Sequence, residues 1–182
     1  MWQKSISSQV QELRQVERQL LEFAKNRFEQ GPSNDVEIEP FDTKIPRSVV
    51  PLKHHECNVH KQDEEEDCYR IHGLRMRNPS ATLSIRDAPP LVTLHGYMNG
   101  ASYYYRNLMG LSRHFQTIYS LDLLGWGLSS RPNFSLIDDQ LTTAEDFFVE
   151  SLEAWRRNND IQKMTLAGHS MGGYIGVAYC GE

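Results

Sequence analysis

The stretch Gly168-His169-Ser170-Met171-Gly172-Gly173 limits what this chain can fold into more than any other part of its sequence. It matches the pattern G-x-S-x-G, a sharp turn from a strand into a helix that lifts a serine hydroxyl clear of the backbone. Apolar residues 164–167 precede the turn as a strand would, and residues 174–179 can form the helix. Glycine allows tight angles and close packing that a Cβ would block. We therefore predict a nucleophile at Ser170, in a turn shaped by Gly168, His169 and Gly172.

A serine hydroxyl attacks an ester only when a base takes its proton. His169 adjoins Ser170, but neighbouring side chains point in different directions, so we expect it to pack or hydrogen-bond rather than act as the base. In enzymes built on this turn the acid and the histidine follow the serine, and no histidine follows Ser170 among the 182 residues. We expect the chain to hold part of the catalytic machinery and to be inactive alone.

Composition narrows the class of protein. Hydrophobic residues make up 39% of the chain and charged residues 24%, as in a globular protein. A net charge of −5 argues against a general nucleic-acid binder. No apolar run is long enough to span a membrane, the N-terminus lacks the apolar core of a secretory signal, and three cysteines are too few for a disulfide framework. We expect an intracellular, cytoplasmic protein that is not secreted and uses no cofactor.

Residues 1–30 form the first segment, an amphipathic helix over residues 5–29. Its apolar positions recur every three or four residues and are Val10, Leu13, Val16, Leu20 and Phe23. This helix either packs on the body of the protein or lies on a lipid surface, with Trp2 and Phe28 as anchors. The sequence leaves both open, so peripheral contact with a membrane or lipid droplet through this segment is a hypothesis.

Residues 31–67 form the second segment, predicted to be a polar, flexible linker. Prolines interrupt any regular element, and Asp63–Asp67 is an acidic block typical of a solvated loop. One group of metal-ligating residue types has a spacing short enough for zinc but no second pair at zinc-finger distance: His54, His55, Cys57, His60 and Cys68. We predict no metal site there.

Residues 68–182 form the third segment, in which apolar strands alternate with helical stretches. A capping box at Thr142–Glu145 opens a helix that runs to about Asn158, and the predicted strands are residues 69–74, 82–85, 91–94, 117–121 and 164–167. This alternation predicts an α/β domain with a mostly parallel sheet and helices on both faces. The last strand is expected at an open sheet edge, which would leave the isolated chain marginally stable.

A second motif, Leu94–Gly100, follows the strand at 91–94. Ester hydrolysis passes through a tetrahedral intermediate with a negative oxygen, and preplaced backbone N–H groups stabilise that charge. One donor belongs to the residue after the nucleophile and the other to the loop after the third strand. We therefore predict an oxyanion hole from the backbone of Tyr97 and Met171, with His95 and Gly96 supporting the loop.

A third motif, Asp122–Pro132, follows the strand at 117–121. Its Gly125-Trp126-Gly127 lacks the third glycine and the following helix of a dinucleotide site. We predict a structural loop at the rim of a pocket, with Asp122 hydrogen-bonded to local backbone. Trp126 is a candidate apolar wall for an acyl group.

Together the strings LHGYMNGASYYYRNL (residues 94–108), DLLGWGLSSRP (residues 122–132) and GHSMGG (residues 168–173) resemble the α/β-hydrolase-domain subfamily 4/5. The resemblance covers residues 68–182, as the N-terminal half of an α/β-hydrolase fold, and is weaker in the N-terminal helix. That family contains lysophospholipase-type enzymes, a lipid-droplet coactivator of triacylglycerol lipase, lysophosphatidic acid acyltransferases and cardiolipin-directed acyl hydrolases. It implies an acyl-ester lipid substrate, attachment to a membrane or droplet surface, Ser170 as the nucleophile, and the backbone of Tyr97 and Met171 as the oxyanion hole.

Two departures from the family matter. Its coactivator branch has asparagine at the nucleophile position, so Ser170 groups this chain with the active branch. The family's acid, its histidine and the His-x-x-x-x-Asp motif tied to acyltransferase activity would lie beyond Glu182, and none is assigned here.

The leading hypothesis is a serine-dependent lipid acyl-ester hydrolase or acyltransferase that acts, in its complete form, on a lysophospholipid or phospholipid. A second hypothesis is a non-catalytic lipid-surface or protein-binding module that keeps the scaffold, because a serine without a base gains little over water. A third is a fragment with no independent role.

Overall fold

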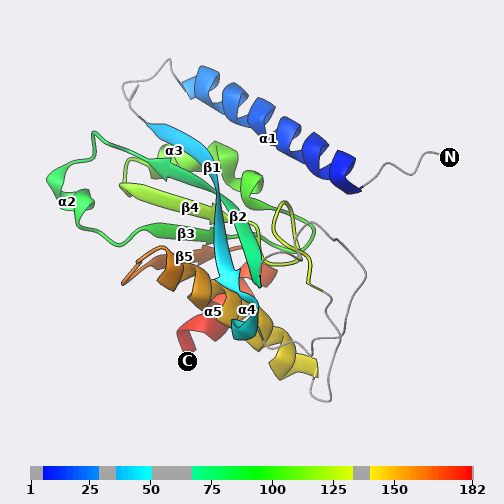
Figure 1. Ribbon diagram of the computed structural model, residues 1–182. Helices are drawn as coiled ribbons and strands as arrows, with labels where there is room; N and C mark the ends of the chain where they lie inside the picture. Colours follow the sequence, from blue (N-terminus) through cyan, green and yellow to red (C-terminus); the bar gives the residue numbers. More distant parts are fainter. Residues whose placement is uncertain (1–5, 29–35, 51–66, 133–139, 182) are drawn as a thin grey trace.

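The computed structural model of the protein describes residues 6–28, 36–50, 67–132 and 140–181. At its centre five strands form one sheet in the order β1-β2-β4-β3-β5 (Figure 1). They are β1 (Glu37–Pro46), β2 (Cys68–Arg77), β3 (Leu91–Leu94), β4 (Thr117–Leu121) and β5 (Thr165–Gly168). β2 runs antiparallel to both of its neighbours, whereas β4, β3 and β5 are mutually parallel. The predicted α/β class is confirmed: the sheet is mixed, with four of its five described strands pointing the same way and β2 reversed, so that parallel pairing is confined to β4-β3-β5.

Strand β1 lies in the segment predicted to be a flexible linker, and for residues 37–46 that prediction is wrong. Ile38 is buried in the core on one face of the sheet, whereas Thr43 and Ile45, on the opposite side of the strand, are buried on the other face, so β1 contributes to both faces of the sheet despite its polar composition. Pro40 does not break the strand because β1 is at the edge of the described sheet, where an outward N–H needs no partner. A short 3-10 turn, η1 (Arg47–Val49), follows it.

Two further elements differ from the prediction, one in its type and one in where it begins. Residues 82–85, predicted as a strand, form the single-turn helix α2 (Leu83–Arg86), in which the N–H groups of Ile85 and Arg86 donate to the Thr82 carbonyl at 3.0 and 3.2 Å. This local turn satisfies backbone groups that a strand would have to pair with a neighbour. Helix α4 (Gln140–Asn158) begins before the predicted capping box, so Thr142 lies inside its first turn.

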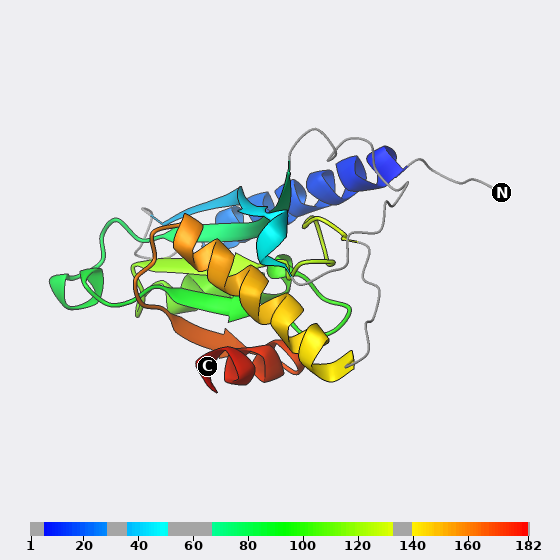
Figure 2. The same ribbon diagram turned by 60° about the horizontal axis from the view of Figure 1, so that its bottom comes forward.

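Helices cover both faces of the sheet, as predicted (Figure 2). α1 (Ile6–Phe28) and α3 (Tyr105–Leu111) lie on one face, and α4 and α5 (Met171–Gly181) lie on the other. The core under α4 and α5 contains the fully buried Trp155, together with Leu94 and Ile175. The core under α1 and α3 contains Leu21 and Leu108. The sheet is thereby held between two apolar layers.

Helix α1 packs on the body of the protein through a face that does not coincide with its apolar pattern. Leu21 and Ala24 are buried, whereas Leu13, Val16 and Phe23 are 46%, 60% and 50% exposed. Each residue turns a helix by about 100°, so the buried face and these three residues, the apolar stripe, lie about a quarter-turn apart. The helix thus docks and still presents apolar surface outward. Both predicted anchors, the residue Trp2 and the side chain of Phe28, lie outside what the structure describes.

Strand β5 forms the other edge of the described sheet. It pairs with β3, and its residues are exposed or half-buried. In the helix that follows, Tyr174 and Val177 are 51% and 76% exposed. The turn that carries Ser170 therefore lies on an open side of the described chain.

Candidate active site

The three loops that carry the sequence motifs leave the sheet at one edge. Leu94 is paired with Leu121 on one side and with Gly168 on the other, so β3, β4 and β5 end at the same level. The carboxyl ends of parallel strands are the usual ligand-binding edge of an open α/β sheet. The motifs, far apart in sequence, therefore meet at the place where chemistry is expected.

Ser170 lies between β5 and α5 with φ +53°, a left-handed backbone conformation. An L-residue is strained there, and such strain at a functional site fixes the direction of a side chain. The flanking glycines are demanded by close contacts. A Cβ on Gly168 would lie 2.2 Å from the Gly172 carbonyl oxygen, and a Cβ on Gly172 would lie 2.3 Å from the Leu94 carbonyl oxygen. Ser170 is exposed, in the geometry of a nucleophile elbow.

The loop after β3 lies directly against this turn. The His169 N–H donates to the Leu94 carbonyl at 3.1 Å and so extends the β3–β5 pairing into the loop. A Cβ on Gly96 would lie 2.9 Å from the His169 Nδ1 and 3.3 Å from the Ser170 Cβ, so the absence of a side chain there lets the loop approach the turn closely. Met98, in the same loop, also has a left-handed backbone, with φ +61°. Backbone strain is thus present on both sides of the serine.

Two backbone donors next to Ser170 have no acceptor. Within the described part of the chain, neither the Tyr97 N–H nor the Met171 N–H makes a hydrogen bond. Met171 is the first residue of α5, where an N–H has no acceptor in its own helix. The two N–H groups predicted to form an oxyanion hole therefore have no acceptor among the described residues and are available to a ligand oxygen.

His95 supports this loop as a neutral side chain. It is fully buried. Its Nδ1–H donates to the Gly96 carbonyl at 2.8 Å, and its Nε2 accepts from the Leu123 N–H at 3.0 Å. The second bond requires an unprotonated Nε2, and burial lowers the pKa of the imidazole in the same direction. Because both ring nitrogens are engaged, His95 ties the loops after β3 and β4 together and does not serve as a base for Ser170.

Asp122 is a second tie between the same loops. Its Oδ1 accepts from the Ala101 N–H at 2.6 Å and its Oδ2 from the Leu128 N–H at 2.7 Å. Burial raises the pKa of this carboxyl, while the two amide hydrogen bonds and the nearby His72 oppose that rise. The carboxylate therefore holds η2 (Ala101–Tyr104), the short helix after the loop, against residues 122–130.

Aromatic side chains surround the turn. The Trp126 ring makes edge contacts with Tyr97 and His95, with centroids 5.0 and 6.2 Å apart. The ring of the exposed His169 stacks on Tyr103 at 5.8 Å; packing of this side chain was expected from the sequence, but its partner was not. The run of three tyrosines at 103–105, directly after a glycine-rich loop, is the signal that could have indicated it. These rings form an amphipathic wall beside Ser170.

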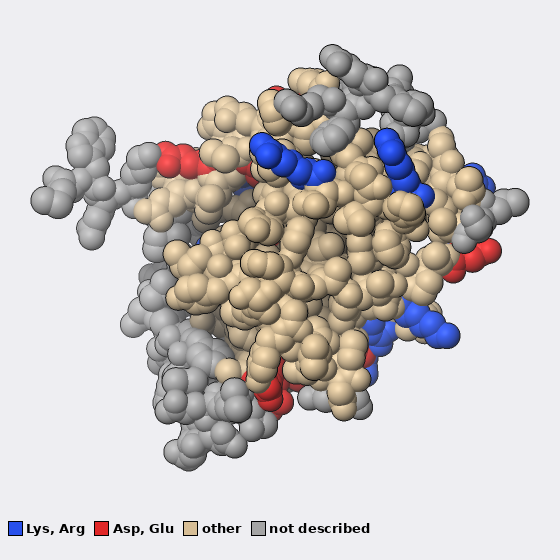
Figure 3. All heavy atoms as spheres, turned by 180° about the vertical axis from the view of Figure 1, so that it is seen from behind, with Lys and Arg blue, Asp and Glu red and all other residues tan. Residues whose placement is uncertain are grey.

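Apolar side chains also line a cavity beside the turn that carries Ser170. A cavity of about 120 Å³ lies between α4 and α5, and Met171, Phe148 and Ile175 are among its lining residues. Residues 164–181 contain no Asp, Glu, Lys or Arg. Seen from behind, the molecule shows a broad surface with few charged side chains, most of them near the margin (Figure 3). The strand and helix on either side of Ser170 therefore carry no charged side chain.

Among the described residues, no group of three or more His, Cys, Asp or Glu side chains is placed to hold a metal ion. Of the five potential ligands named in the sequence, Cys68 is half-buried at the start of β2, and the other four lie outside the described residues: His54, His55, Cys57 and His60. None of the helices that the structure describes is both long enough and apolar enough to span a membrane.

Comparison with known proteins identifies the scaffold. The model of the alpha/beta hydrolase fold family matches residues 89–182, which is more than half of the chain. The chain belongs to the α/β-hydrolase fold family. That match contains all three motif loops and the two left-handed residues of the site, Met98 and Ser170. The predicted membership is thus confirmed over the part of the chain that forms the site.

Several similar curated proteins carry the names of enzymes that act on lipids. The chain is 36% identical over 136 residues to the (lyso)-N-acylphosphatidylethanolamine lipase of Bos taurus, covering 72% of this chain and 39% of that protein. It is 42% identical over 96 residues to the 1-acylglycerol-3-phosphate O-acyltransferase ABHD5 of Mus musculus, covering 53% of this chain and 26% of that protein. The chain therefore spans less than half the length of these relatives. Their names confirm the resemblance to subfamily 4/5 that the motif strings indicated.

A solved structure shows the same α/β-hydrolase architecture. The crystal structure of a membrane phospholipase A, a bacterial virulence factor, superimposes with a TM-score of 0.54 at 20% identity, covering 95% of this chain and 40% of that one. At this identity the likeness establishes the fold, and the site must be argued from its own geometry.

Proposed function

We propose that this protein is a serine-dependent acyl-ester hydrolase or acyltransferase of lipids, with Ser170 as its nucleophile. The observation that carries the proposal is the strained, exposed Ser170 beside two backbone N–H groups that have no acceptor. A left-handed L-residue costs folding free energy, and such strain is concentrated at functional sites. The names of the similar lipid lipase and acyltransferase support the substrate class.

The chemistry follows from the positions of these groups. The Ser170 hydroxyl attacks the ester carbonyl carbon, its proton passes to a base, and the carbonyl oxygen becomes an oxyanion that accepts from the Tyr97 and Met171 N–H groups. Collapse of the intermediate expels the alcohol and leaves an acyl group on Ser170. Water then releases a fatty acid in a hydrolase, or a lysophospholipid accepts the acyl group in an acyltransferase.

The base and its acid partner remain part of the proposal. His95 has both nitrogens engaged, and the His169 ring is stacked on Tyr103, so neither is assigned as the base. We propose that the histidine and the acid come from outside these 182 residues. The short coverage of the relatives' lengths supports this. As an isolated chain, the described machinery would bind an ester without activating the serine.

Attachment to a lipid surface is proposed for helix α1. Its apolar stripe is exposed while the helix is docked, so it can contact a bilayer or lipid droplet without unfolding the core. An amphipathic helix binds a lipid interface through its buried apolar area. The helix that carries the stripe packs on the same sheet that carries Ser170. Binding of the stripe to a lipid surface would therefore keep the enzyme near its substrate.

Two glutamates placed in the stripe should weaken that attachment. Val16→Glu with Phe23→Glu is expected to lower binding to phospholipid vesicles by about tenfold or more, because two apolar side chains are replaced by charges. The control Gln15→Glu with Gln19→Glu adds the same charge at exposed polar positions of α1 and should bind more tightly than the stripe variant. Vesicle sedimentation measures both, and equal affinities of the two variants would argue against the proposed contact.

A fluorophosphonate probe separates the enzyme from the alternative, a non-catalytic module on the same scaffold. The native protein, isolated from its source, is expected to carry one adduct at Ser170, and a lysophospholipid should slow its formation. Such probes react with a serine whose proton is removed by a base, at a site that stabilises the negative charge developing on the probe's phosphoryl oxygen. Peptide mass analysis locates the adduct. An unlabelled Ser170 in the folded native protein would favour the non-catalytic module.

A further inference from the structure

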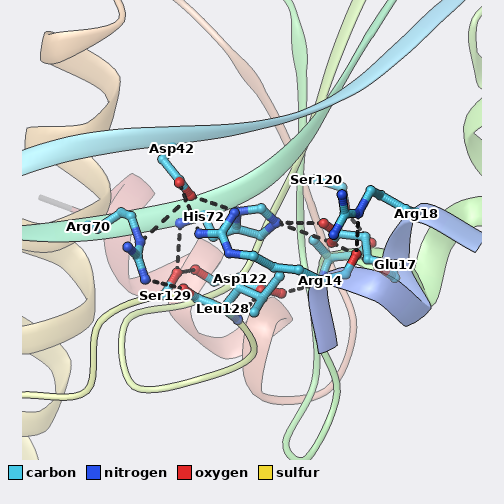
Figure 4. Close-up of polar contacts among 12 residues, drawn as sticks. Arg14, Glu17, Arg18, Asp42, Arg70, His72, Ser120, Asp122, Leu128 and Ser129 are labelled. Carbon is cyan, nitrogen blue, oxygen red and sulfur yellow. Dashed lines mark hydrogen bonds and ion pairs between the residues drawn. The ribbon is translucent and has the colours of Figure 1, made fainter. Parts of the chain in front are cut away.

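A cluster of charges centred on the buried His72 and Glu17 joins α1 to the sheet, and sequence analysis did not single it out. His72 of β2 is 1% exposed. Its Nε2 lies 3.1 Å from both carboxylate oxygens of Glu17 in α1, and its Nδ1 lies 2.7 Å from Asp42 Oδ1 in β1 (Figure 4). Carboxylates accept hydrogen bonds, so both ring nitrogens must donate and His72 carries a positive charge. We call Glu17, His72 and Asp42 the α1 latch.

Other charges complete the surroundings of the latch. Arg14 of α1 and Arg70 of β2 pair with Asp42 at 3.3 and 3.7 Å. The negative charge of Asp122, in the loop after β4, also interacts with the positive charge of His72. Three cations thus face three carboxylates. Glu17 is itself 7% exposed, so removing one partner would leave an uncompensated charge in a buried place.

The same cluster reaches the loop beside Ser170 by two routes. Glu17 Oε1 accepts from the Ser102 hydroxyl at 3.4 Å, and Ser102 belongs to η2, directly after that loop. The Asp122 N–H donates to the His72 carbonyl at 2.9 Å, while the Asp122 carboxylate holds the Ala101 N–H. Helix α1 therefore contacts η2 directly and, through His72 and Asp122, indirectly.

We propose that Glu17 and His72 are positioning residues for the oxyanion loop, by which we mean residues 96–104, and that the docking of α1 on the sheet holds this loop in place. The apolar stripe and the latch are on one helix, so contact of the stripe with a lipid surface acts on the loop through α1. The catalytic consequence rests on the proposed function. The mechanical coupling between α1 and residues 96–104 does not.

The pH dependence of the latch has a definite sign. Burial alone would lower the pKa of His72, but its hydrogen bonds with Asp42 and Glu17 raise it from 6.5 to about 9. A folded pKa above the unfolded value gives stabilisation that is complete below about pH 6.5 and is lost as the pH rises through about 9. The latch therefore stays charged near neutral pH and opens in alkali.

Hydrogen–deuterium exchange of the native protein tests the coupling without using activity. Glu17→Gln is expected to speed exchange about tenfold in α1 and in residues 96–104, because charge-assisted hydrogen bonds are lost. Residues 147–155 of α4, on the opposite face, should exchange as before. The matched control Glu22→Gln alters an exposed carboxylate of the same helix and should change neither segment.

Two further measurements keep the test decisive if Glu17→Gln folds poorly. Glu17→Gln with His72→Gln restores the balance of charge and should recover part of the lost protection. In the unaltered protein, protection of residues 96–104, corrected for intrinsic exchange, should fall as the pH rises through about 9, together with that of α1. Exchange that rises in α1 while residues 96–104 stay protected would overturn the proposal, as would equal acceleration in α4. Failure of the fluorophosphonate test would leave this result unaffected.

Discussion

Replacing Ser170 by alanine is expected to lower ester hydrolysis by about a thousandfold or more, because removal of a catalytic serine leaves only binding and oxyanion stabilisation. Alanine keeps the strained backbone, so the unfolding free energy should stay close to that of the unaltered protein. Hydrolysis of p-nitrophenyl butyrate and of a lysophospholipid by the native enzyme measures the loss. Retention of activity by the alanine variant would end the claim that Ser170 is the nucleophile.

The glycine variant at the same position gives a second, independent result. Ser170→Gly should be as inactive as the alanine variant but more stable than the unaltered protein by about 1 kcal/mol, since glycine adopts a left-handed φ without strain. Urea unfolding compares the three proteins. A glycine variant that is less stable than the alanine variant would show that the φ of +53° stores no strain.

Replacing Gly172 by alanine is expected to destabilise the protein by about 3 kcal/mol, which is a large effect for one methyl group. The added Cβ would lie 2.3 Å from the Leu94 carbonyl oxygen and 2.6 Å from that of His95. These are backbone atoms, which cannot rotate away, so α5 would have to move from β3. That movement would also separate Ser170 from the oxyanion loop, and activity should fall with stability.

Gly176 in the same helix provides the matched control. A Cβ there meets nothing within 4 Å, so Gly176→Ala should keep activity and gain up to about 1 kcal/mol from better helix propensity. Urea unfolding and ester hydrolysis are measured on both variants. If Gly172→Ala and Gly176→Ala behaved alike, the close packing of α5 on β3 would be refuted.

These experiments act on features that are local in sequence. The turn around Ser170 could be predicted because the types of six consecutive residues determine its backbone, and each apolar strand next to a motif is a local signal. The positions of the loops at 95–100 and 122–130 followed from their places directly after strands β3 and β4. Local propensity failed for residues 82–85, where a turn closed by hydrogen bonds to Thr82 replaced the expected strand.

Strand β1 shows why the polar segment was misjudged. Its few apolar residues are separated by Pro40 and by charged neighbours and do not alternate regularly, and pairing with β2 is what places Ile38 and Ile45 in the cores on the two sides of the sheet. Helix α1 shows the same limit. Its strongest apolar pattern is the exposed stripe, while the buried face includes a glutamate that sequence reasoning would place in solvent.

The sequence by itself determined the family, the elbow and the loops around it, because contiguous residues with fixed spacing specify those backbone geometries. The tertiary structure alone decided that His95 is neutral and committed to two backbone groups, and that His72 is charged between Glu17 and Asp42. A histidine's charge depends on which groups surround it and on how far water is excluded. In this protein those groups come from segments up to 55 residues apart, which no local pattern brings together.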